Sequence, residues 1–192
     1  MNSRSAHVTS EVLVFDDAAG WDAWLAAHHD SADGAVLRIA RKGAPGLTIH
    51  AALEVALCHG WIDSVRRRGD DQHFLQRYSP RRKGSPWSAV NVALVEELTA
   101  AGRMRPGGLA EVAAAKADGR WDAAYASQAT ATVPGDLRAA LDADGAARAA
   151  FDALTKSGRY AILLTLMKAR TPAARAKALD KALAGLRAAD LR

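Results

Sequence analysis

The sequence predicts an α+β fold: a small, mostly antiparallel sheet of about four strands, packed by helices and followed by a helical C-terminal portion. Short segments rich in β-branched and aromatic residues are confined to the N-terminal part, and two of them flank a turn at Gly69-Asp70. Apolar residues with helical spacing alternate with these segments. From Pro106 onward the sequence is Ala-rich and punctuated by proline and glycine, which is typical of a run of helices.

The first elements are two strands and the helix between them. We expect strands over 12–15 and 35–40, where β-forming residues cluster. Asp16 or Asp17 caps the intervening helix, which runs through Ala27, because a short acidic side chain accepts from the free amides of a first turn.

Two further helices have clear start and stop signals. Thr48 occupies an N-cap position before the most regular amphipathic repeat, which Gly60 ends. Ser85-Pro86 predicts a second helix start, since proline is tolerated at the first helical position, and this helix is expected to reach Gly102.

The rest of the chain is expected to be helical. We treat 1–192 as a single domain with a mixed portion over 1–126 and a helical portion over 133–192. The expected helices cover 108–118, 134–143, 146–156, 159–169 and 172–186.

The segments 61–67 and 72–78 are expected to form a hairpin whose one face is a pocket wall. Pairing about Gly69-Asp70 places on this face aromatic and aliphatic groups with one carboxylate and one amide. Alternatively, the face is core and Asp63 is satisfied by Gln76 or a nearby arginine. The predicted pairs are Trp61–Tyr78, Asp63–Gln76 and Val65–Phe74, and the opposite face holds Ile62, Ser64, Arg66, His73, Leu75 and Arg77.

Positive charge is concentrated around this hairpin. The formal net charge is +5, and seven basic residues lie between Ile62 and Lys83 against three aspartates. The last of these cations directly precede a predicted helix start, where free backbone amides favour an anion. We expect Arg77, Arg81, Ser88 and Asn91 to contact an anionic ligand, with Trp61 and Trp87 bordering the site. The alternative is that the loop charges are solvated and Ser85 is only a cap.

No catalytic or metal signature accompanies this basic segment. Cys58 is the only cysteine, so an internal disulfide and a multi-cysteine metal cluster are excluded. Cys58-His59 ends a helix, where the dipole disfavours a thiolate, so we reject it as a nucleophile and base pair. We expect no metal and no cofactor. With neither a secretion signal nor a membrane span in the sequence, we expect a cytoplasmic protein without membrane insertion.

Several segments of the chain together form a recognisable pattern. They are Ala56–Ser64, Leu75–Arg81, Trp87-Ser88, Asn91, Gly102–Met104, Ala115–Asp122, Val133-Pro134, Asp136-Leu137 and Ser157–Tyr160. This pattern resembles the bacteriocin-protection, YdeI/OmpD-associated (OmdA) family. The resemblance implies a role in tolerance of bacteriocins, antimicrobial peptides or other stress and an association with a porin, but no reaction and no catalytic residues.

Three functions follow as hypotheses. The first is a non-catalytic protein that binds a small anionic or aromatic ligand through Trp61, Asp63, Gln76 and Tyr78 together with the basic group above. The second is a small enzyme with Asp63 as general acid or base and Arg77 or Arg81 stabilising negative charge. The third is a weak nucleic-acid binder, which the acidic residues oppose. The sequence does not determine the oligomeric state.

Overall fold

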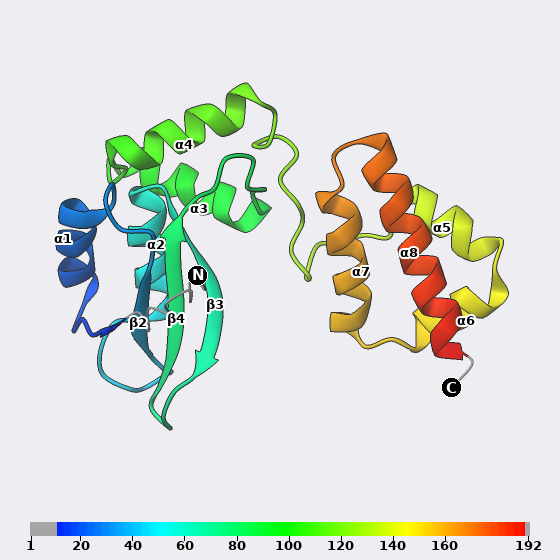
Figure 1. Cartoon of the computed structure of the whole chain (residues 1–192), viewed down its shortest axis with the longest axis horizontal. Helices are drawn as coiled ribbons and strands as arrows, with labels where there is room; N and C mark the ends of the chain where they lie inside the picture. Colours follow the sequence, from blue (N-terminus) through cyan, green and yellow to red (C-terminus); the bar gives the residue numbers. More distant parts are fainter. Residues whose placement is uncertain (1–10, 191–192) are drawn as a thin grey trace, which may run out of the picture. The chain divides into compact units, whose positions relative to one another are not determined.

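The computed structural model describes residues 11–190 and shows an α+β fold, as predicted (Figure 1). The chain divides into two compact units. Unit 1 comprises the described residues through Ser85 together with Ala93–Asp122, and unit 2 comprises Pro86–Val92 and the described residues from Ala123 onward.

Unit 1 is built on a four-stranded sheet. Its order is β1-β2-β4-β3, with β1 parallel to β2 and the other two pairs antiparallel, so the sheet is mixed. The strands are β1 (Val12–Leu13), β2 (Ala35–Ala40), β3 (Trp61–Arg68) and β4 (His73–Pro80).

Helices α1 (Ala18–His28) and α2 (Ile49–Cys58) cover one face of this sheet. Asp17 and Thr48 cap them as expected, accepting from the amides of Gly20 and Ala51. Gly60 ends α2 at φ +78°, a conformation that glycine adopts without strain. The core under the two helices contains Trp21, Leu25, Leu37, Ile39, Ala52, Val55, Trp61, Phe74 and Tyr78.

The predicted register of the β3–β4 hairpin is wrong. Trp61 pairs with Pro80 and Asp63 with Tyr78, two positions from the expected partners. A shift of two residues keeps each side chain on its face, because side chains alternate with period two. The ladder is then interrupted, and Arg66 pairs with Gln76.

The predicted helix start at Ser85-Pro86 is also wrong. Helix α3 (Ala89–Ala100) begins later, and the Ser88 hydroxyl accepts from the Asn91 amide at 3.2 Å. The residues before the helix form a short parallel bridge instead: the Tyr125 amide donates to the Trp87 carbonyl at 3.0 Å. Helix α4 (Pro106–Ala117) follows in unit 1, with proline in its first turn.

Four helices form unit 2 around their own core. Buried leucines and Phe151 fill it, and short loops join consecutive helices. The helices are α5 (Gly135–Asp142), α6 (Gly145–Ala153), α7 (Lys156–Lys168) and α8 (Pro172–Asp190).

Two arginines of α8 join this helix to the starts of α5 and α6. Arg175 Nε and Nη2 donate to the two carboxylate oxygens of Asp136, each at 2.7 Å. Arg187 Nε donates at 2.6 Å to Asp144, which caps α6. These contacts hold the pKa of both aspartates below the ordinary value: the hydrogen bond from Arg175 acts most on Asp136, and the Ala147 amide acts most on Asp144, followed by Arg187.

Asp136→Asn should lower the free energy of unfolding at pH 7 by about 1 kcal/mol, because it removes a two-pronged ion pair at a partly exposed site. A lowered folded-state pKa contributes stability above the unfolded-state pKa and loses it as pH falls, so the difference from wild type should shrink below about pH 4. Urea titrations followed by circular dichroism measure this. Asp142→Asn is the control, since its pair with Arg148 is exposed on both sides; equal losses in the two variants would contradict the prediction.

Candidate functional site

The predicted site residues fall into both units. Trp61, Asp63, Gln76, Arg77, Tyr78 and Arg81 belong to unit 1, whereas Trp87, Ser88 and Asn91 belong to unit 2. Within unit 1, the hairpin brings Asp63, Gln76 and Tyr78 to the face covered by α1 and α2. We call Asp63, Arg66, Gln76, Tyr78 and Arg81 the hairpin cluster.

Arg66 reaches this cluster through an irregularity in β3. Ser64 and Val65 both lie opposite Arg77, between the pairs Asp63–Tyr78 and Arg66–Gln76. One extra residue reverses the side-chain alternation that follows, which places Arg66 on the same face as Asp63 and corrects the prediction that it lies on the other face. Its Nε donates to Gln76 Oε1 at 3.3 Å.

The Arg66 guanidinium and the Trp61 ring are both held in place by neighbouring groups. The guanidinium carbon lies 4.2 Å from the centroid of the Phe74 ring, a cation–π geometry. Trp61 is buried in the unit 1 core, and its indole N–H donates to the His29 carbonyl at 3.3 Å. The Trp61 ring therefore packs as core, in agreement with the plainer alternative for this face.

The Tyr78 hydroxyl is the least satisfied polar group of the cluster. The side chain is fully buried, and the hydroxyl has no hydrogen-bond partner among the described residues. Burial raises the pKa of the phenol, and the neighbouring Asp63 charge raises it further, so the hydroxyl keeps its proton. A buried polar group without a partner costs about 1–3 kcal/mol, and native structures rarely tolerate one without a reason.

Asp63 faces Tyr78 directly across the strands and is half-buried. Burial raises the pKa of its carboxyl, although its own backbone amide and the charges of Arg66 and Arg81 act in the opposite direction. Gln76 does not satisfy this carboxylate as the alternative expected, because its side-chain NH2 group donates to the Arg77 carbonyl at 3.5 Å while its oxygen accepts from Arg66. Ionisation of the Asp63 carboxyl therefore lowers the stability of the folded protein.

Arg81 is the most buried cation beside this carboxylate. It directly follows β4, its amide donates to the Gly60 carbonyl at 3.0 Å, and the residue is only 6% exposed. An arginine is rarely buried to this extent unless it is paired. Arg81 thus supplies fixed positive charge close to Asp63.

Arg77 lies on the opposite face of β4, apart from the hairpin cluster. Its Nη2 donates to the Asp33 carbonyl at 3.1 Å, and its guanidinium packs over Gly34 in space that a larger residue at that position would need. Arg77 therefore ties the loop before β2 to the sheet.

In unit 2, Ser88 accepts from the Asn91 amide and so caps α3, and Trp87 is buried. The predicted contact of Trp87, Ser88 and Asn91 with a ligand stays a prediction.

The structure shows a second polar cluster in unit 1 that sequence reasoning missed. His59 Nε2 bonds to one oxygen of Asp22 at 2.8 Å, and Arg105 Nη2 donates to the other at 2.8 Å. These contacts lower the pKa of Asp22 although burial acts to raise it. A cavity of about 350 Å³ adjoins the cluster, lined by Asp22, Cys58, Arg103 and Arg105. Burial raises the pKa of the Cys58 thiol, which keeps it protonated.

No spacing in the sequence could have indicated this second cluster, because its members come from α1, the end of α2 and the turn before α4. Among the described residues, no group of three or more His, Cys, Asp or Glu side chains is arranged to hold a metal ion. No helix in the described part of the chain has the length and apolar character needed to cross a bilayer.

Two family models match the chain. Residues 13–111 match the model described as "Domain of unknown function (DUF8412)", and residues 130–188 match the model described as "Bacteriocin-protection, YdeI or OmpD-Associated". The second match is the family that the sequence resembles, over the C-terminal part of the chain. No curated protein and no solved structure matches the chain.

Asp63→Asn should raise the free energy of unfolding at pH 7, by roughly 0.5–1 kcal/mol, because it removes a carboxylate that is ionised at a cost. A raised folded-state pKa gives stability that is present below the unfolded-state pKa and is lost as pH rises. The variant should therefore match wild type below about pH 4, where the carboxyl is protonated in both states. Urea titrations followed by tryptophan fluorescence measure this, with exposed Asp71→Asn as control; a less stable Asp63→Asn at pH 7 would refute it.

Proposed function

The chain belongs to the family described as Domain of unknown function (DUF8412), and on that premise we propose that it is a non-catalytic binding protein which takes a small anionic or aromatic ligand at the hairpin cluster. The observation that carries the proposal is the fully buried Tyr78 hydroxyl, which has no partner among the described residues and faces Asp63. A polar group supplied from outside the chain would satisfy it.

The charges around Tyr78 define the chemistry of this ligand. Arg66 and Arg81 supply positive charge, so an oxyanion is favoured. Asp63 can accept a hydrogen bond from a ligand hydroxyl or amine, and Tyr78 can donate one. The rings of Trp61 and Phe74 lie on the same face and make the surroundings of the cluster apolar. A small carboxylate or phosphate that also carries a hydroxyl or an aromatic ring fits this set.

The cost of the cluster supports a functional role. A carboxylate with a raised pKa and a buried hydroxyl without a partner both lower stability. Natural proteins keep such groups where function needs them. A cluster that served only to hold the hairpin together would pair these groups with each other.

The biological setting of the proposal comes from the second family match. Its printed description concerns protection against bacteriocins, so we place the ligand binding in tolerance of bacteriocins, antimicrobial peptides or related stress. A cytoplasmic location and a porin association remain part of the proposal.

Titration of the protein with inorganic phosphate, benzoate and 4-hydroxybenzoate tests the site, with the Trp61 indole N–H resonance as reporter. At least one of these anions should shift the resonance saturably. Tyr78→Phe, which keeps the ring, should weaken binding about tenfold, as expected for a hydrogen bond to a charged group.

Asp71→Asn, in the turn of the same hairpin, should leave the affinity unchanged. Tyr78→Phe should also leave the protein at least as stable as wild type, since it removes a hydroxyl without a partner. An indole resonance that none of the three anions moves, or a Tyr78→Phe variant of wild-type affinity, would remove the proposal.

The enzyme hypothesis is the second candidate, favoured by the raised pKa of Asp63, which keeps the acid form present at higher pH. Arg81 and Arg66 are the cations available to stabilise negative charge, because Arg77 is bonded to the Asp33 carbonyl on the other face. Turnover of an aryl phosphate or aryl ester that is lost in Asp63→Asn and kept in Asp71→Asn would establish an enzyme. The nucleic-acid alternative is weakened because the Arg66 guanidinium is engaged by the Phe74 ring and by Gln76.

A further inference from the structure

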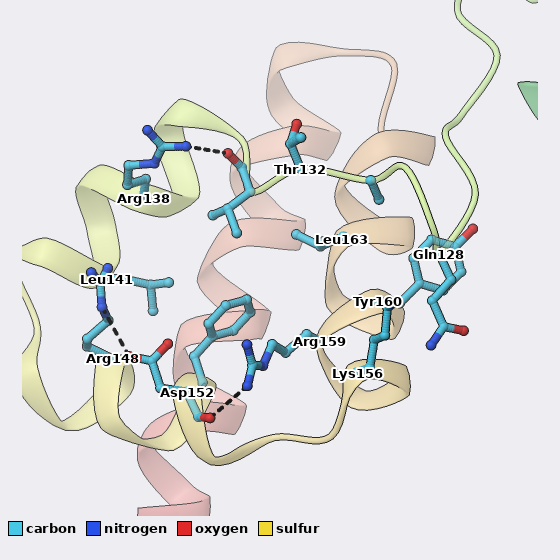
Figure 2. A pocket seen from close by; sticks show the side chains of 13 residues that line it. Gln128, Thr132, Arg138, Leu141, Arg148, Asp152, Lys156, Arg159, Tyr160 and Leu163 are labelled. Carbon is cyan, nitrogen blue, oxygen red and sulfur yellow. Dashed lines mark hydrogen bonds and ion pairs between the residues drawn. The ribbon is translucent and has the colours of Figure 1, made fainter.

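We propose that unit 2 contains a separate binding site for a small organic anion with an apolar body, in an open cavity of about 720 Å³ (Figure 2). The segment before α5 and helices α5, α6 and α7 line this cavity, so unit 2 alone defines its shape. Its volume lies in the range of ligand pockets, about 300–1,000 Å³.

The floor of the cavity is apolar. Leu141, Phe151 and Leu163 line it and are at most 5% exposed, since they also belong to the unit 2 core. Val133 and Ala131 extend this surface beside them. Binding becomes more favourable when an apolar group replaces water on such a surface.

The rim is cationic. Arg138, Arg148, Lys156 and Arg159 are exposed side chains around the cavity, against the single carboxylate of Asp152. Arg148 is neutralised by Asp142 and Asp152, at 2.9 and 3.3 Å. Within residues 11–190, the other three cations form no ion pair with a carboxylate, so their positive charge is available to a ligand.

Backbone carbonyls hold two of these three cations in place. Arg159 Nε donates to the Leu154 carbonyl at 3.1 Å and its Nη2 to the Asp152 carbonyl at 2.9 Å, the second of which is drawn in Figure 2. Arg138 donates to the Val133 carbonyl at 3.4 Å. Neutral acceptors fix the guanidinium groups without cancelling their charge, which reduces the entropy lost when a ligand binds.

The third available cation, Lys156, lies where a positive charge lowers helix stability. Lys156 is the first residue of α7, directly after the cap Thr155, and Arg159 lies in the same turn. The positive end of the helix dipole disfavours cations there. Charge, dipole and cavity therefore combine into one region of positive potential beside an apolar floor.

The wall of the cavity beside Lys156 is fixed by hydrogen bonds within unit 2. The Tyr160 hydroxyl donates to the Ala126 carbonyl at 3.0 Å, and Gln128 Nε2 donates to the Ser157 hydroxyl at 3.3 Å. Both bonds hold the segment before α5 against α7. The cavity is therefore formed before any ligand arrives, which favours affinity.

This combination selects one class of ligand. An inorganic anion would leave the floor in contact with water, a neutral apolar molecule would make no use of the rim, and a cation would be repelled. An organic anion with an aromatic or branched apolar body satisfies both parts of the cavity.

Calorimetric titration with four matched probes tests this class: naphthalene-1-sulfonate, 1-naphthalenemethanol, 1-naphthylmethylammonium and inorganic sulfate. The sulfonate should bind at least tenfold more tightly than each of the other three. Equal affinity for sulfate, or preference for the neutral or cationic naphthalene, would overturn the proposal.

Lys156→Glu should reduce the sulfonate affinity at least tenfold while leaving the melting temperature unchanged or raised, because glutamate is favoured in a first helical turn. Lys177→Glu is the matched control: it makes the same charge change on the exposed surface of α8 and should bind as wild type. A Lys156→Glu variant with wild-type affinity would refute the site. Tyr78→Phe should not alter sulfonate binding, so this result is independent of the hairpin cluster.

Discussion

The interruption of the β3–β4 ladder is the constraint on which the hairpin cluster depends. After the pair Asp63–Tyr78, a regular antiparallel ladder would place Val65 opposite Gln76. The extra residue moves Val65 outward, where it is 52% exposed, and puts Arg66 opposite Gln76 on the helix-covered face. A bulge of this kind redirects a side chain and bends its own strand locally. As a result, the Arg66 cation lies beside Asp63 and Tyr78, and Val65 is exposed.

The balance of burial and charge in unit 1 distinguishes its two polar clusters. Asp22 is held between His59 and Arg105, and its pKa is lowered, so its ionised form stabilises the fold. Asp63 has guanidinium groups nearby, yet its pKa is raised because burial is the largest effect. The first carboxylate joins three segments of unit 1. The ionised form of Asp63 instead lowers the stability of the fold. This difference is why we assign the binding role to the hairpin cluster and not to the cluster around Asp22.

Features set by local chemistry could be predicted from the sequence. The caps Asp17 and Thr48, the end of α2 at Gly60 and the strand over 35–40 were predicted correctly because each depends on residues within one turn or one alternation. The common face of Trp61 and Tyr78 was also predicted, since a slip of two residues preserves it. The bulge was not, because neither Ser64 nor Val65 is a residue type that marks one. The helix start at Ser85-Pro86 was wrong because Trp87 is bonded to Tyr125, a contact between distant segments.

The cationic cavity of unit 2 shows why a site of this kind escapes sequence reasoning. Its four cations lie on three helices and each has the spacing of an ordinary surface charge, whereas its floor consists of leucines and a phenylalanine that any helical core would contain. What makes them a site is the absence of carboxylate partners around three of the cations in the described chain, together with open volume over the floor. The only local sign is Lys156 followed by Arg159 at a helix start, a position where helices favour acidic residues. Charges that oppose the local preference of a helix are therefore the feature to examine when no motif is present.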